Sequence, residues 1–119
     1  MDAVSPVLDR DVALERSGGD AELLRELADL FLTEYPSQLA VLSAGVERAD
    51  SEEVDRAAHM LKGSVANFGA AAAVNTLLEL EQAGRKRDLA GCGAALRELV
   101  RVLEVLHIEL SDLSATPSG

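Results

Sequence analysis

Aromatic residues are nearly absent from this chain: they make up 3% of its 119 residues, as two phenylalanines, one tyrosine and no tryptophan. Because 48% of the residues are nevertheless hydrophobic, leucine, valine and alanine must fill the core, and these residues pack well between helices. Proline is scarce too, with Pro36 the only one between Asp20 and Leu113. The length suits one domain, and both scarcities favour an all-α fold.

Cysteine, basic residues and long apolar runs are also in short supply. Cys92 is the only cysteine, which excludes an intrachain disulfide and favours a reducing, cytoplasmic location. No apolar run reaches the length of about 18 residues that a membrane span needs, and the acidic start Met1-Asp2 does not resemble a signal peptide. The net charge of −10 would repel nucleic acid and anionic membranes, so we expect neither as a partner.

What is present is helical periodicity along most of the chain. A short helix is expected to end near Arg16, before Ser17-Gly18-Gly19. Four longer helices are expected over residues 20–46, 50–69, 70–86 and 88–113. Asp20 and Asp50 are suitable N-caps. We interpret the segment around Pro36 as a kink in one helix, and two helices joined by a tight turn are the alternative.

The connections between these segments are short, so consecutive helices should be antiparallel neighbours. The sequence therefore predicts an antiparallel, up-down-up-down four-helix bundle with a short extra N-terminal helix. We expect residues 1–7 to be a flexible arm, residues 8–113 to form the bundle and residues 114–119 to be a flexible tail.

The segment 58–64, Ala-His-Met-Leu-Lys-Gly-Ser, carries the most unusual combination of side chains. With Leu61 at 0° on a helical wheel, His59 falls at about 160°, Lys62 at about 100° and Gly63 at about −160°. His59 should therefore face solvent, beside a lysine and a missing side chain. A glycine inside a helix costs about 1 kcal/mol of stability relative to alanine. The presence of Gly63 therefore has to be explained, and the close approach of another molecule is one explanation.

This combination favours phosphoryl transfer over the alternative that His59 and Lys62 are simply solvated. A neutral imidazole is a nucleophile, and the transferred phosphoryl group needs positive charge near its oxygens. An exposed Lys62 can supply that charge as a mobile donor.

Glu81 is a candidate partner for His59. It falls on the inward stripe of its helix with Leu78, and antiparallel packing would bring it to the height of His59, where a carboxylate could fix the tautomer of the imidazole. The alternative is a solvated carboxylate at the rim of the bundle. Arg85 lies close by and could play a secondary role. His107 falls on the apolar stripe of the last helix and is expected at the boundary of the core, and two histidines on distant helices do not suit a metal site in the bundle.

Residues 59–64, together with Ala66-Asn67-Phe68-Gly69-Ala70, strongly resemble the histidine phosphotransfer (HPt) domain of bacterial phosphorelays, and the resemblance extends over roughly residues 8–110. It implies that His59 is phosphorylated at Nε2, that Lys62 stabilises the phosphoryl group and that Gly63 clears space for the partner. It also implies that Glu81 hydrogen-bonds the histidine. Val65 departs from the family, in which many members have a small polar residue or alanine there.

The resemblance implies a phosphocarrier rather than an enzyme with its own ATP-binding kinase activity. Such a carrier accepts the phosphoryl group on His59 from the aspartyl phosphate of one receiver domain and passes it to another. Its partners would be receiver domains of response regulators or hybrid histidine kinases, and we expect a monomer. No cofactor or metal is expected on this chain, because Mg²⁺ belongs to the receiver. The alternative function is a non-catalytic helical adaptor that binds receiver or kinase domains.

A receiver has to dock around His59. The expected first helix and the segment before it carry apolar residues that are candidates for part of that contact, and their alternative role is to cap the open end of the bundle. These residues are Val7, Leu8, Val12 and Leu14.

Overall fold

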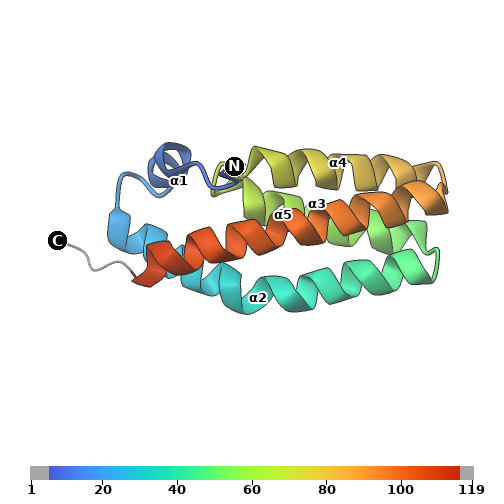
Figure 1. Ribbon diagram of the computed structural model, residues 1–119, viewed down its shortest axis with the longest axis horizontal. Helices are drawn as coiled ribbons and strands as arrows, with labels where there is room; N and C mark the ends of the chain where they lie inside the picture. Colours follow the sequence, from blue (N-terminus) through green and yellow to red (C-terminus); the bar gives the residue numbers. More distant parts are fainter. Residues whose placement is uncertain (1–5, 116–119) are drawn as a thin grey trace, which may run out of the picture.

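The computed structural model describes residues 6–115, which form five helices and no strand (Figure 1). The helices are α1 (Arg10–Arg16), α2 (Ala21–Glu47), α3 (Ser51–Ala66), α4 (Ala71–Arg85) and α5 (Leu89–Ala115). Helices α2 to α5 run alternately up and down, each packs against the next, and α5 closes the bundle against α2. The short α1 lies at the end where α2 begins and α5 ends. The predicted all-α bundle is confirmed.

Local signals in the sequence explain where three of the long helices begin. The Asp20 side chain accepts hydrogen bonds from the backbone N–H groups of Glu22 and Leu23 at the start of α2, and Asp50 accepts one from Glu53 in α3. Asp88 accepts one from Gly91 at 2.9 Å in α5. These bonds satisfy N–H groups that have no partner within the helix.

Pro36 lies inside α2, which continues without interruption from Ala21 to Glu47. The proline ring has no N–H, so the carbonyl of Leu32 lacks its usual partner four residues later. Packing against α3 and α5 nevertheless keeps the segment helical. The alternative of two helices joined by a turn is excluded.

The core is aliphatic, and the few aromatic residues gather at one end of it. Phe31 and Tyr35 stack with their ring centroids 5.0 Å apart, and Phe31 meets Phe68 edge-on at 5.4 Å. The remaining core consists of leucine, valine and alanine, with Cys92. The largest fully buried side chains are Leu42, Leu61, Val65, Leu77, Leu80, Leu99, Leu103, Leu106 and Leu110.

His107 corrects one prediction, because it is exposed on α5 rather than set at the core boundary. Its Nδ1 atom lies 2.7 Å from the hydroxyl oxygen of Tyr35, and the two rings meet edge-on. The apolar stripe of α5 passes through Leu103, Leu106 and Leu110, which leaves His107 beside the stripe. It therefore links the surfaces of α5 and α2.

Within the described residues, packing and helix extend beyond the predicted range of residues 8–113. Val7 is buried, and the backbone N–H groups of Val7 and Leu8 donate to Oε1 of Glu109 on α5, at 3.0 and 2.8 Å. Val7 is thus packed instead of belonging to an arm, and the rest of that arm, apart from the exposed Pro6, lies outside the described residues. Ser114 and Ala115 belong to α5, and residues 116–119 of the expected tail lie outside the description. No helix in residues 6–115 combines the length and apolarity needed to cross a membrane.

Gly69 lies in the turn between α3 and α4, where α1 and its N-cap pack closely against it. Its φ is +61°, and a Cβ atom there would lie 2.7 Å from the Cβ of Asp9 and 2.8 Å from the Cβ of Val12. The backbone N–H of Asp9 also donates to the carbonyl of Phe68, at 3.0 Å. Only glycine allows this turn and this close approach together.

We predict that Gly69→Ala lowers the free energy of unfolding by about 1–3 kcal/mol more than Gly18→Ala does, because overpacking adds to the backbone strain. Gly18 is the matched control: its φ is +69°, but a Cβ atom there would meet nothing within 4 Å. Urea denaturation of the two variants measures the difference. Equal losses of unfolding free energy in the two variants would show that α1 does not pack closely against Gly69.

Candidate functional site

His59 lies on the outer surface of α3, where its side chain is exposed to solvent as the helical wheel indicated. The next residues along the helix are Met60, which is 57% exposed, and Leu61, which is fully buried. No hydrogen bond or ion pair joins the imidazole to another residue in the range 6–115. Both ring nitrogens are therefore available to a partner molecule.

Gly63 follows His59 by one helical turn and leaves open space beside it. A Cβ atom at Gly63 would meet nothing within 4 Å, so packing within the chain does not require a glycine at this position. The cost of glycine in a helix is thus not offset by any contact of the folded chain. The opening next to the imidazole supports the interpretation that another molecule approaches there.

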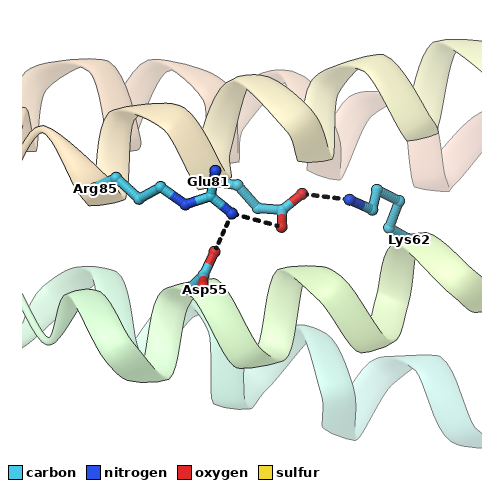
Figure 2. A network of polar contacts seen from close by, with 4 residues as sticks. All are labelled: Asp55, Lys62, Glu81 and Arg85. Carbon is cyan, nitrogen blue, oxygen red and sulfur yellow. Dashed lines mark hydrogen bonds and ion pairs between the residues drawn. The ribbon is translucent and has the colours of Figure 1, made fainter.

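Lys62 and Glu81 form an ion pair between α3 and α4, with Nζ and Oε1 separated by 2.7 Å (Figure 2). The side chain of Glu81 is 4% exposed and that of Lys62 is 23% exposed. This arrangement differs from both expectations: Lys62 is not a free donor, and Glu81 bonds to Lys62 instead of His59. The physical reason is that a buried carboxylate needs a cation, and the long lysine side chain reaches inward from the flank of α3.

Two further residues extend this pair into a row of alternating charges (Figure 2). Nη2 of Arg85 donates to Oδ1 of Asp55 at 3.1 Å and lies 3.7 Å from Oε2 of Glu81. Arg85 follows Glu81 by four residues, a spacing at which side chains meet on a helix. Sequence reasoning missed Asp55, although it precedes Lys62 by two turns and so lies on the same face of α3.

The row contains two cations and two anions, so its formal charges cancel. A separate ion pair lies elsewhere on α3, where Arg56 contacts Glu53 at 3.3 Å. The side chain of Arg56 is 67% exposed. Every cation in these pairs already has a carboxylate partner, so an anionic group on His59 would compete with that carboxylate for the cation's donors. Within residues 6–115, no three His, Cys, Asp or Glu side chains are grouped to hold a metal ion.

A groove lined by both apolar and polar residues runs along the boundary of α2 and α3, on the side of α3 away from Glu81. It consists of two adjoining hollows that share Gln38, whose Oε1 atom is buried without a hydrogen-bond partner in the described chain. Met60 and Val41 line one hollow and are both exposed. The other residues of the groove are Leu27, Leu30, Phe31, Glu34, Glu53, Arg56, Ala57, Ser64, Asn67 and Phe68.

We predict that Lys62→Met destabilises the folded chain by about 1–3 kcal/mol, because it leaves a buried carboxylate without its closest donor. The loss should shrink when Glu81 is changed to Gln in the same chain, since the neutral amide no longer needs a cation. Urea denaturation of the wild type, both single variants and the double variant measures this coupling. Additive losses would contradict the ion pair.

The described helices resemble those of histidine-containing phosphotransfer proteins of known structure. One is HptB from Pseudomonas aeruginosa PAO1, with a TM-score of 0.82 and 24% identity over 92% of this chain and 95% of that one. Another is a rice protein provisionally assigned as a histidine-containing phosphotransfer protein, with a TM-score of 0.76 and 19% identity over 91% of this chain and 79% of that one. At these identities the likeness establishes the fold alone.

No protein with a curated description matches this chain. The sequence model of the Hpt domain matches residues 26–116, a range that contains His59, Lys62, Gly63 and Glu81 and covers most of the bundle. The chain therefore belongs to the Hpt domain family.

Proposed function

We propose that this chain is a phosphocarrier of a multistep phosphorelay, with His59 as the residue that carries the phosphoryl group. The observation that carries the proposal is the exposed, unpaired imidazole beside the opening at Gly63, in a chain of the Hpt family. The donor and the acceptor would be aspartates of two receiver domains. The receiver would supply Mg²⁺, and this chain would need no cofactor.

The proposed transfer is one substitution at phosphorus. The lone pair of Nε2 of His59 forms the N–P bond while the P–O bond to the receiver's aspartate breaks, and its electron pair leaves with the carboxylate oxygen. The proton on Nδ1 stays on the ring, which becomes a cation bearing a dianionic group. The second transfer runs the same step in reverse toward another receiver. The protein mainly has to present Nε2 and supply positive charge.

The groove between α2 and α3 is the surface that we propose for the receiver. It adjoins the exposed Met60 next to His59, and its apolar rim continues through Leu30, which is 52% exposed. Leu14 on α1 and Leu23 on α2 are exposed as well. Val7 and Leu8, which the sequence also suggested for docking, are buried and serve to hold α1 on the bundle.

The alternative is an adaptor that binds receivers through the same groove without carrying phosphate. Such a protein would have no use for a nucleophile at its surface or for a glycine that the fold does not need. The open position at Gly63 therefore favours the carrier.

We predict that the wild-type chain gains one acid-labile, base-stable phosphate when it is mixed with a phosphorylated receiver, and that His59→Gln gains none. Because His59 is exposed, the variant should unfold at nearly the same temperature as the wild type. Phosphate-affinity electrophoresis, before and after acid treatment, reads the result. Receiver binding without phosphate on the wild-type chain, across the receivers of the same organism, would favour the adaptor.

We predict that Gly63→Gln slows transfer from a receiver by at least about tenfold, as expected for a misplaced reacting pair. Phosphorylation by phosphoramidate, a small phosphoryl donor, should stay close to the wild-type rate. Helix stability should not fall, because glycine is the poorer helix former.

Gly93→Gln is the matched control, since Gly93 lies inside α5 and has only ordinary contact distance, 3.6 Å, to a side-chain atom of Arg97. It should leave both rates unchanged. A Gly63→Gln variant that is slow with both donors would point to damage at His59 itself and remove the argument from partner access.

A further inference from the structure

The carboxylate of Glu81 has two cations at unequal distances. Lys62 is hydrogen-bonded to Oε1 at 2.7 Å, whereas Nη2 of Arg85 stops 3.7 Å from Oε2. The second separation is longer than a hydrogen bond. Both cations therefore form ion pairs with the buried carboxylate, but only Lys62 is hydrogen-bonded to it (Figure 2).

A phosphoryl group on His59 would compete for the first of these cations. Lys62 follows His59 by three residues on α3, so the two side chains share one side of the helix. A dianion on His59 would draw the ammonium group toward itself and weaken its 2.7 Å hydrogen bond to Glu81, a carboxylate that is 4% exposed. If the ammonium group moved away, Glu81 would keep only the longer ion pair to Arg85, at 3.7 Å, and a poorly paired buried charge is strongly unfavourable.

Resting on the proposed function, we propose that Arg85 is a positioning residue that takes over Glu81 when Lys62 turns to the phosphoryl group. Glu81 thereby exchanges its hydrogen-bonded partner, from Lys62 in the free chain to Arg85 in the phosphorylated chain. Arg85 acts through Lys62 and does not touch the phosphoryl group. The free-energy cost of separating Lys62 from Glu81 then determines how strongly Lys62 can stabilise the phosphoryl group.

The position of Arg85 fits this exchange. Its side chain is 64% exposed, so most of the guanidinium remains hydrated and can move at little cost. The same Nη2 atom already donates to Oδ1 of Asp55, which holds the guanidinium beside Glu81. A guanidinium has five donors, so it can keep Asp55 and gain Oε2 of Glu81 together.

The exchange can be tested first without any phosphate, because Lys62→Met imitates the departure of the lysine. With Arg85 present, the loss of unfolding free energy should be limited. In an Arg85→Met background, the same Lys62→Met change should cost clearly more, since no cation remains for Glu81. Equal losses in the two backgrounds, measured by urea denaturation, would overturn the exchange.

The second test measures transfer. Arg85→Met should slow the gain of phosphate on His59 from both a receiver and phosphoramidate by about fivefold or more, in the range of coupled charged neighbours. Arg85→Lys should recover most of the rate. In a Glu81→Gln background, where no buried charge detains Lys62, Arg85→Met should change the rate by less than about twofold.

Arg101→Met is the matched control: Arg101 is 61% exposed on α5 and pairs with Glu98 three residues before it, so its loss should leave transfer unchanged. A slowing by Arg85→Met that is as large in the Glu81→Gln background as in the wild-type background would mean that Arg85 contacts the phosphoryl group or the receiver directly, and would overturn the inference. An unchanged rate would do the same. Failure of the wild-type chain to gain phosphate would refute the carrier alone, because the denaturation test would still decide whether Arg85 replaces Lys62.

Discussion

The carboxylate of Glu81 is almost completely removed from water, and the polar part of the candidate site is organised around its charge. An aliphatic core offers nothing to solvate it, so cations must come from the surfaces of the two helices that enclose it. Lys62 on α3 is hydrogen-bonded to the carboxylate, and Arg85 on α4, held by Asp55, forms a longer ion pair with it. The packing of α3 against α4 thus determines where positive charge lies relative to His59.

Local chemistry made much of the fold predictable. The capping aspartates Asp20, Asp50 and Asp88 depend only on residues a turn away, and the apolar periodicity depends only on the helix itself. The exposure of His59 followed from the same geometry, because Leu61 and Val65 had to face the core. The extent of the packed N-terminal segment was not predictable, because it depends on Glu109, which lies about a hundred residues further along the chain.

The partners within the site were the harder part. The sequence left open whether Glu81 is buried or solvated at the rim, and Leu78, with which it was placed on one stripe, is exposed. Which donor Glu81 holds depends on the rotation of α3 relative to α4 and on side-chain conformations. The sequence reasoning assigned Glu81 to His59 and left Lys62 free, whereas the two form a pair with each other. A buried carboxylate selects a full positive charge over a neutral imidazole when both are within reach. Family resemblance located these residues without deciding which of them bond to each other.

The placement of His59 on the exposed face of α3 has a kinetic consequence. On the proposed function, donor and acceptor both need the same nitrogen through the same opening at Gly63, so they exclude one another in space. The two partners would bind one after the other: the first has to dissociate before the second can bind, and a ternary complex would not form. The rate of phosphoryl transfer through the relay would then depend on how long each partner stays bound. An excess of either unphosphorylated partner would slow that transfer by occupying the surface around His59.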